Sequence, residues 1–331
     1  MLAMDEQKSH PIGGIDYPRT LQEFDKWFPT EDGCIHYLMR LRWPRGFQCP
    51  KCGSQESWRT ERGLLHCKHC NHQTSVIAGT IFQGTRKPLR VWFQAMWYVT
   101  NQKVGVSALG LKRVLGLGSY QTAWTWLHKL RRAMVRPDRD MLKGHVEVDE
   151  TYVGGEEKGV YGRKTKTKSI VAIAIEVHSP KGFGRVRLKQ IPDVTGPSLI
   201  GFVKSVVQAG SIVETDGWGG YNDLPMHGYE HVKRILSKNQ DPDRVVLPGP
   251  HRIASLLKRW LLGTHQGAVR YEHLDYYLDE YTFRFNRRSS KARGLLFHRL
   301  VEQAVQIMPS TYEGIKGGTT NRVRTSPLHV T

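Results

Sequence analysis

Four of the five cysteines in this chain of 331 residues form two Cys-x-x-Cys pairs, Cys49 with Cys52 and Cys67 with Cys70. Each turn of this kind presents two thiolates to one ion, and zinc takes four thiolates in a tetrahedron. Fourteen residues separate the two pairs, and a strand-like run leads into the second one, as the hairpin of a zinc ribbon requires. We therefore predict a structural zinc ion in a ribbon over residues 46–84, which depends on the metal for much of its stability.

Other interpretations of the cysteines fit less well. Disulfides are typical of exported proteins, whereas residues 1–10 are polar and lack the apolar core of a signal peptide. A thioredoxin-like redox motif needs no second pair at ribbon spacing. The fifth cysteine, Cys34, is expected to be a small buried apolar residue. Because four cysteines complete a zinc shell, we expect the nearby histidines to be bystanders: His66, His69 and His72.

The chain is strongly basic, with a formal net charge of +19 and a pI near 9.8. Such a charge attracts polyanions, above all nucleic acid. Between Arg86 and Lys143, twelve lysines and arginines stand against two acids. Basic residues can serve solubility alone, but their concentration in one segment favours DNA binding. No apolar run approaches the roughly 20 residues of a membrane span, and we expect a cytoplasmic, nucleoid-associated protein.

Residues 85–140 have the periodicity of three helices. Thr85-Arg-Lys-Pro88 is a typical helix start, a second helix is predicted over 107–115 with Ser107 as its N-cap, and a third over 120–134 after a glycine-containing turn. The last two helices fit a helix-turn-helix, although a plain helical hairpin with a solvated basic face fits the same pattern. The third helix is predicted to have a polar face, with Gln121 and Thr125 as base readers, Lys129 and Arg132 as phosphate contacts, and His128.

The C-terminal half predicts an α/β fold with the strand order of an RNase H-like domain. Alternation and apolar runs indicate strands over 146–153, 169–177 and 185–194, a helix over 197–207 and a fourth strand over 211–216. An acid lies in the middle of the first strand and another at the end of the fourth: Asp149 and Asp216. On adjacent strands, their carboxylates can hold a pair of Mg²⁺ ions about 4 Å apart. A lone aspartate would be more simply explained as a cap or turn residue, but two acids in this strand order favour a metal site.

Several short blocks of sequence occur together in one known family. They are the two cysteine pairs, Val148-Asp-Glu-Thr-Tyr-Val-Gly-Gly155, Asp216-Gly-Trp-Gly-Gly-Tyr221, His251-Arg-Ile-Ala-Ser-Leu-Leu-Lys258-Arg-Trp, Gly263-Thr-His-Gln-Gly267 and Tyr281-Thr-Phe-Arg-Phe-Asn-Arg-Arg288. With these blocks the chain resembles the zinc-ribbon insertion-sequence transposases that have an ISXO-type DDE catalytic domain, over residues 20–305. The resemblance implies an RNase H-like fold, binding of double-stranded DNA at terminal inverted repeats, and DNA cleavage and strand transfer that depend on Mg²⁺ or Mn²⁺.

The third catalytic position departs from the acid that the family usually has. Related transposases commonly place a glutamate at the start of the helix after the fifth strand and a lysine seven residues later; His251 and Lys258 stand at these positions. Thirty-four residues separate Asp216 from His251, close to the separation typical of DDE enzymes. His251 could bind the second metal, with Mn²⁺ tolerated better because imidazole is a poor ligand for hard Mg²⁺. It could instead orient a water or the scissile phosphate, mark an impaired site, or be a surface residue without a role. The nearby acids that could serve in its place are Asp241, Asp243 and Glu280, although Glu280 lies too far along the chain to replace a residue in the first turn of this helix.

We therefore predict a catalytic set of Asp149, Asp216, His251 and Lys258, with Lys258 on a substrate phosphate. Further DNA contacts are predicted at Arg259, Arg287 and Arg288. The predicted order of domains is a helical lead-in (1–45), the zinc ribbon (46–84), the helix-turn-helix segment (85–140), the RNase H-like domain (141–305) and a flexible tail (306–331). Pairing of two element ends implies at least a homodimer on DNA. Two alternatives stay open: a DNA-binding regulator with impaired catalysis, and an RNase H-like nuclease that cuts without joining.

Overall fold

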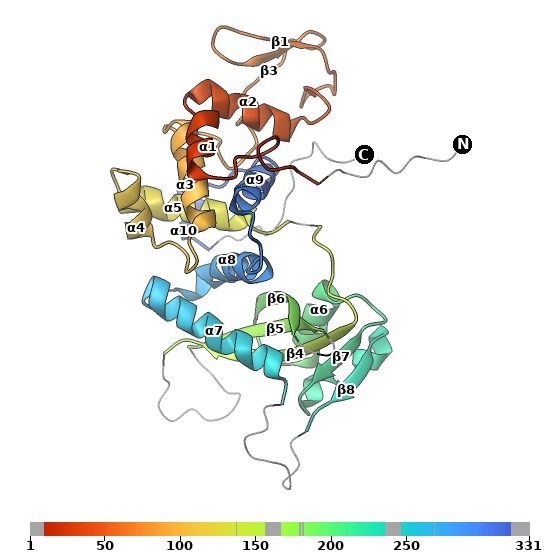
Figure 1. The fold of residues 1–331 in the computed structure, drawn as a ribbon. Coiled ribbons are helices and arrows are strands. Elements are labelled where there is room, and N and C mark those ends of the chain that lie inside the picture. The colour runs from red at the N-terminus through yellow and green to blue at the C-terminus, as the bar shows by residue number, and fades with distance from the viewer. Residues whose placement is uncertain are drawn as a thin grey trace, which may run out of the picture. The chain divides into compact units, whose positions relative to one another are not determined.

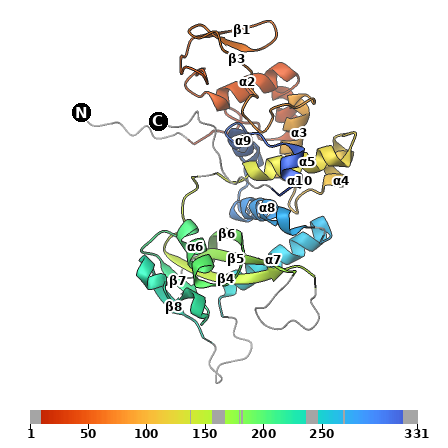
Figure 2. The ribbon, with the colours of Figure 1, turned by 180° about the vertical axis from the view of Figure 1, so that it is seen from behind.

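The computed structural model describes residues 10–136, 138–155, 167–178, 180, 182–235, 246–267 and 269–318. The chain divides into two compact units (Figures 1 and 2). We call residues 1–137 together with 290–331 the helical unit, and residues 138–289 the sheet unit. Among the described residues no helix is both long and apolar enough to cross a membrane.

The helical unit combines helices with a small antiparallel sheet. Its helices are α1 (Leu21–Trp27), α2 (Glu31–Arg42), α3 (Leu89–Asn101), α4 (Ala108–Val114), α5 (Tyr120–Ala133), α9 (Arg293–Ala304) and α10 (Tyr312–Lys316). Its strands are β1 (Ser57–Arg59), β2 (Leu65–Cys67) and β3 (Gln73–Thr74), paired antiparallel in that order. Threonine and serine side chains accept a backbone N–H in the first turn of most of these helices, which satisfies groups that the helix itself leaves unpaired.

An aromatic cluster ties the C-terminal helix α9 to the N-terminal helices. The ring of Phe297 lies 5.6 Å from that of Phe24, 5.8 Å from that of Phe28 and 5.6 Å from that of Phe93. The helix also passes close to the N-terminal chain at Gly294, where a Cβ would come within 1.8 Å of the Pro18 carbonyl oxygen. The predicted catalytic domain ends at residue 305 and so includes α9, whereas the compact sheet unit ends at residue 289.

The helix α10 lies inside the stretch 306–331 that the sequence predicted as a flexible tail. Ile315 of this helix is buried, and the ring of Tyr312 lies 6.1 Å from that of Trp124 on α5. A flexible tail is therefore wrong for the residues of α10, because they pack on the helical unit. Residues 319–331 lie outside the described residues.

The helices α4 and α5 confirm the second and third helices of the predicted helix-turn-helix to within one residue at each end. Ser107 is the N-cap of α4, and its hydroxyl oxygen accepts the N–H of Gly110 at 3.0 Å. Gly116 in the intervening turn has a φ of +60°, a conformation that glycine adopts without steric cost. The preceding helix, α3, follows Pro88 as expected.

The sheet unit contains five strands in the order β6-β5-β4-β7-β8. Its elements are β4 (His145–Val153), β5 (Ser169–Val177), β6 (Phe183–Ile191), α6 (Gly196–Val206), β7 (Ile212–Thr215), η1 (Gly219–Tyr221), η2 (Leu224–His227), β8 (Glu230–Lys233), α7 (Pro248–His265), η3 (Tyr271–His273) and α8 (Leu274–Asn286). The first three strands are antiparallel, and β7 and β8 join β4 in parallel. This mixed sheet with its helices confirms the predicted RNase H-like α/β fold. One strand ends early: β6 stops at Ile191 rather than at Val194 because Pro192 has no N–H for the ladder.

The two faces of this sheet bury different residues of the same strands. Val146 and Val148 of β4 pack with α6 on one face, and Ile173 of β5 packs with α7 and α8 on the other. Side chains alternate between the faces along a strand. The odd-numbered residues of β4, which include Asp149, therefore face α7.

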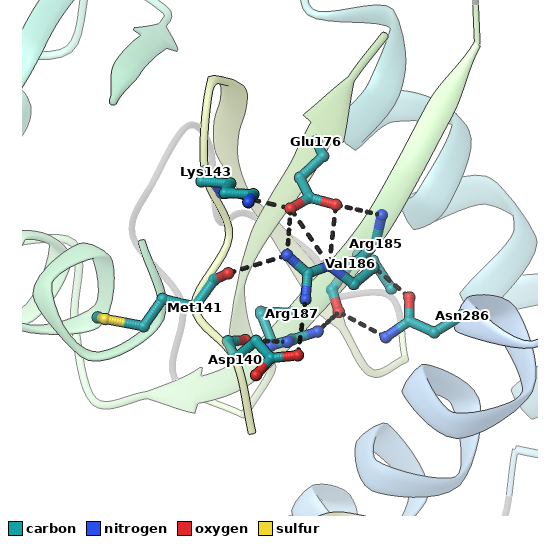
Figure 3. A network of polar contacts seen from close by, with 8 residues as sticks. All are labelled: Asp140, Met141, Lys143, Glu176, Arg185, Val186, Arg187 and Asn286. Atoms are coloured by element: carbon teal, nitrogen blue, oxygen red, sulfur yellow. Dashed lines mark hydrogen bonds and ion pairs between the residues drawn. The ribbon is translucent and has the colours of Figure 1, made fainter. Parts of the chain in front are cut away.

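A polar network holds residues 140–143, which lead into β4, against the sheet (Figure 3). The buried Glu176 of β5 accepts from the guanidinium of Arg185 at 2.7 Å and from the N–H of Lys143 at 3.3 Å. Arg185 also donates to the carbonyl of Met141 at 3.0 Å, and Arg187 donates to that of Asp140 at 2.5 Å. Residues 140–143 are thereby held on strands β5 and β6. On the open edge of β6, the Asn286 amide accepts from the N–H of Val186 at 2.8 Å and donates to its carbonyl at 3.1 Å, and so replaces a neighbouring strand.

Candidate active site, zinc centre and DNA-binding surface

Of the two predicted catalytic aspartates, Asp149 lies on β4, and Asp216 directly follows the adjacent strand β7. Glu147 of β4 and Glu214 of β7 are partners in the parallel ladder, and Asp149 and Asp216 follow them by two residues. The N–H of Glu150 donates to Asp149 Oδ1 at 2.8 Å, and the N–H of Trp218 donates to Asp216 Oδ1 at 3.0 Å. Carboxylate oxygens are the donors that Mg²⁺ and Mn²⁺ prefer, so these two residues have the chemistry that the predicted metal ions need.

His251 lies in the first turn of α7, over the same face. Its Nε2 is 4.0 Å from Asp149 Oδ2. The His251 side chain is 60% exposed and that of Asp149 18% exposed, so the imidazole can reach solvent or a bound substrate. A catalytic role of His251, including metal binding, stays a prediction.

Lys258 follows His251 by seven residues on the same helix. Both side chains are exposed, as are those of Arg252 and Arg259, while Ile253 is fully buried against the sheet. Two turns of helix bring residues i and i+7 to one face. The solvent-facing side of α7 thus carries a row of basic groups that begins at His251.

Of the three acids that could serve in place of His251, only Glu280 lies within the described residues, and its carboxylate is not next to Asp149. Glu280 of α8 is 1% exposed and accepts the guanidinium of Arg284 one turn further along, at 2.7 Å. Its carboxylate is therefore buried and already paired with Arg284. Asp241 and Asp243 lie outside the described residues.

The four paired cysteines lie together as a cluster that could hold the predicted zinc ion. Their sulfurs all lie within 4.8 Å of one another, and within the described residues no other set of three or more potential ligands does so. The Sγ atoms of Cys49 and Cys70 are 3.6 Å apart, as are those of Cys52 and Cys67. Tetrahedral ligands with Zn–S bonds of about 2.3 Å lie about 3.8 Å apart, so the cluster fits zinc.

The surroundings of the cysteines also agree with the prediction. The backbone N–H groups of Cys70 and His69 lower the pKa of the Cys67 thiol, whereas burial and the neighbouring sulfurs raise the pKa of the Cys52 thiol, so the cluster holds its negative charge first at Cys67. His66 stacks on Trp58 with ring centroids 3.9 Å apart, outside the sulfur cluster. Cys34 is fully buried, and burial raises the pKa of its thiol to about 12, as an inert apolar residue requires.

The predicted polar face of the third helix is only partly polar in the structure. Gln121 is exposed and Thr125 is half-buried, with its hydroxyl donating to the Gln121 carbonyl at 2.7 Å. Lys129 is half-buried and donates to the Ile81 carbonyl at 3.3 Å, and burial lowers the pKa of its ammonium group. The placement of His128 on this face is wrong, because its side chain is completely buried.

The cause of that error is the second layer of helices around α5. Both α9 and α10 pack on α5, and the ring of Trp124 lies 4.1 Å from the His128 ring. Burial on two sides leaves a narrower exposed strip than an isolated helix-turn-helix would have. The exposed strip includes Gln121, and Arg132 is half-buried.

The two arginines at the end of α8 contact the protein itself. The guanidinium of Arg287 lies over the Phe283 ring at 4.2 Å, and that of Arg288 lies over the Phe285 ring at 4.1 Å. Arg288 also donates to the carbonyls of Gly184 at 3.3 Å and of Phe183. Contact of these arginines with DNA stays a prediction.

Sequence reasoning missed the buried acids around the aspartate pair. Glu147 accepts the N–H of Gly249 at 2.7 Å; burial raises the pKa of Glu147, while this hydrogen bond lowers it. Glu214 accepts from His145 at 2.6 Å and from Arg234. The signal was present in the strand alternation, because each glutamate stands two residues before a predicted catalytic aspartate and so shares its face.

A second missed contact joins the segments that carry the aspartates. The hydroxyl of Tyr221 donates to Glu150 Oε2 at 3.0 Å. Burial, with the negative charges of Glu150 and Asp149, raises the pKa of Tyr221 well above its ordinary value, so the phenol is a neutral donor. Tyr221 follows Asp216 by five residues, and Glu150 is next to Asp149.

The sheet order fits an RNase H-like protein, and comparisons with known proteins show what its parts are similar to. The ISXO2-like transposase domain matches residues 141–286, and the transposase zinc-ribbon domain matches residues 29–73. A protein of Halobacterium salinarum described as "Uncharacterized protein in transposable element ISH50" is 27% identical over 286 residues, which are 78% of this chain and 92% of that protein. In these two stretches the chain is similar to the zinc ribbon and the ISXO2-like catalytic domain of insertion-sequence transposases.

Proposed function

We propose that the chain is a metal-dependent DNA transposase that binds the terminal inverted repeats of its element, cleaves the DNA and joins the freed 3′ end to a target. The observation that supports this most is that Asp149 lies on β4 and Asp216 directly after the adjacent strand β7, with His251 4.0 Å from Asp149. Similarity to the ISXO2-like transposase domain and to the transposase zinc-ribbon domain supports the DNA substrate.

Each residue of the site has a separate task in this proposal. Asp149 and Asp216 hold the catalytic ions, which activate the attacking water or 3′-hydroxyl and stabilise the leaving oxygen. His251 completes the ligand set or orients the attacking water, and Lys258 contacts the phosphate backbone. Because imidazole is a softer ligand than carboxylate, we expect Mn²⁺ to support a higher rate than Mg²⁺.

DNA binding is proposed at two surfaces. The exposed start of α5, with Gln121, reads the element ends, supported by Thr125 and by the charge of Arg132. The exposed face of α7, with Lys258 and Arg259, follows the substrate backbone next to the catalytic aspartates. Two ends must be processed together in transposition, so we propose at least a homodimer on DNA.

Cleavage of a defined duplex tests this proposal. Zinc-loaded protein is mixed with a duplex that carries an element end, with Mg²⁺ or Mn²⁺, and both cleavage and joining are measured. We expect Asp149→Asn and Asp216→Asn to abolish both reactions while DNA binding persists. Glu230→Gln is the control, because this exposed acid lies at the start of the edge strand β8.

The outcomes also separate the alternative functions. End binding by the wild type without cleavage in either metal would contradict the proposal and support a DNA-binding regulator. Cleavage without joining would support a nuclease. Cleavage that survives both aspartate substitutions would place the active site elsewhere.

A further inference from the structure

Four acids stand in two layers on the face of the sheet that meets α7. The upper layer consists of Asp149 on β4 and Asp216, which directly follows β7, and the lower layer of Glu147 and Glu214, two residues earlier in the chain. The glutamates are 5% and 6% exposed, so their carboxylates need partners inside the protein. Those partners differ: Glu214 has two basic side chains, whereas Glu147 has the backbone of α7.

The start of α7 explains why a backbone group is available to Glu147. The residue before the helix, Leu247, is left-handed with a φ of +58° and provides no side-chain cap. Pro248 and Pro250 have no N–H. The N–H of Gly249 therefore lies between two prolines in the first turn, and Glu147 Oε2 accepts it at 2.7 Å. A carboxylate at a helix N-terminus is also favoured by the helix dipole.

Gly249 lets the helix approach the sheet this closely. A Cβ at this position would lie 2.7 Å from Glu147 Oε2, 2.7 Å from Ile175 Cγ2 and 3.1 Å from the Phe183 ring. A side chain would push the helix start away from β4. The missing side chain of Gly249 and the carboxylate of Glu147 therefore both hold the start of α7 against β4.

The contact between Glu147 and Gly249 is next to the proposed catalytic pair of Asp149 and His251. Glu147 and Asp149 are two residues apart on β4, and their partners Gly249 and His251 are two residues apart on α7. Strand geometry separates the two acids by about 6.6 Å along β4. If Gly249 moves away from Glu147, His251 in the same turn of α7 therefore moves relative to Asp149.

We propose that Glu147 is a positioning residue for His251: by holding the Gly249 N–H it sets the distance of the imidazole from Asp149. The inference rests on the proposed function, because it assigns His251 a part in the reaction. Glu214, which lies in the same layer, anchors His145 and Arg234 instead and has no contact with α7 among its described hydrogen bonds.

The first test needs no activity. Hydrogen exchange at the Gly249 amide and along the first turn of α7 is measured in the full zinc-loaded chain for the wild type, Glu147→Gln and Glu147→Leu. The leucine has a similar volume but no acceptor, so we expect exchange in this turn to rise about tenfold or more. The glutamine keeps an acceptor oxygen, so exchange is expected to stay close to that of the wild type. Equal exchange in Glu147→Leu and wild type would overturn the inference.

The second test asks whether Glu147 acts through His251. We expect Glu147→Leu to slow cleavage about 10- to 100-fold, as loss of an outer-shell partner does, and Glu147→Gln to restore most of the rate. In a His251→Ala background the same leucine substitution should change the residual rate less than about threefold, because the group that it misplaces is absent. Gly249→Ala should behave like Glu147→Leu.

Additive losses in the double variant would overturn the inference, because Glu147 would then act by another route. If the wild type cleaves no DNA, the proposed function fails, and the exchange experiment alone decides on the contact between Glu147 and α7. Failure of the function and failure of the inference are thus distinguishable.

Discussion

The bond between Tyr221 and Glu150 gives a quantitative prediction for the aspartate site. Tyr221 is fully buried, and its hydroxyl is 3.0 Å from Glu150 Oε2. Tyr221→Phe removes this oxygen without changing the packing of the ring. A hydrogen bond to a charged group contributes about 1.5–3 kcal/mol, so we expect the sheet unit to lose about 2 kcal/mol of unfolding free energy. Because the bond ties the segment after Asp216 to the neighbour of Asp149, we also expect half-saturation of cleavage by Mn²⁺ to rise about tenfold.

A second tyrosine of the same unit provides the matched control. The Tyr229 hydroxyl donates to the Val207 carbonyl at 3.0 Å, and the ring is also buried. Its acceptor is neutral, so Tyr229→Phe should cost about 1 kcal/mol and leave the metal dependence unchanged. Hydrogen exchange of β4 and β7 measures local stability in both variants, and cleavage against Mn²⁺ concentration measures the site.

The coupling between the two partners is the stricter test. A double-mutant cycle of Tyr221→Phe with Glu150→Gln should give an interaction of about 1–2 kcal/mol. The reasoning is refuted if Tyr221→Phe costs less than about 0.5 kcal/mol. It is also refuted if both tyrosine variants shift the Mn²⁺ dependence equally, since the effect would then come from stability alone.

Three further predictions concern other parts of the molecule. Removal of zinc by a chelator, or Cys67→Ser, should make the ribbon sensitive to protease while the sheet unit keeps its exchange protection; an equally protected ribbon without metal would contradict a structural zinc ion. The bonds from Arg185 outweigh burial and lower the pKa of Glu176, so its stabilisation is present above the ordinary glutamate pKa of about 4.3 and is lost as the pH falls below that value. The difference in urea midpoint between wild type and Glu176→Gln should therefore shrink on acidification, and a constant difference would be inconsistent with this. Gln121→Ala should weaken binding to the element end by about 1–3 kcal/mol, whereas Lys129→Ala should mainly lower the stability of the protein. End binding and thermal unfolding of both variants are measured. Loss of stability in Gln121→Ala together with loss of end binding in Lys129→Ala would refute the assignment.

Local patterns in the sequence predicted the elements of the sheet unit well. The strand over 169–177 is correct at both ends, because its apolar run is buried on both faces and bounded by polar residues. The ladder confirms that β4 and β7 are neighbouring strands; Asp149 lies on β4, and Asp216 directly follows β7 instead of ending it. Seven-residue spacing found the helix of His251 and Lys258, since two turns of helix return to one face.

Contacts between distant parts of the chain could not be predicted in the same way. Phe297 packs against Phe24, and nothing in the local pattern of either segment indicates the other. The burial of His128 has the same origin, because helices from the C-terminal end cover α5. Glu147 was missed for a different reason: its partner is a backbone N–H, and only the folded chain brings Gly249 to it.

Joining of a pre-cleaved 3′ end to target DNA tests the central claim most directly. The zinc-loaded wild type and Asp149→Asn are compared at equal end binding, in Mn²⁺ and in Mg²⁺. The account predicts joined product from the wild type, more in Mn²⁺ than in Mg²⁺, and none from Asp149→Asn. Equal joining by both proteins, or no joining by a wild type that binds the ends, would contradict it.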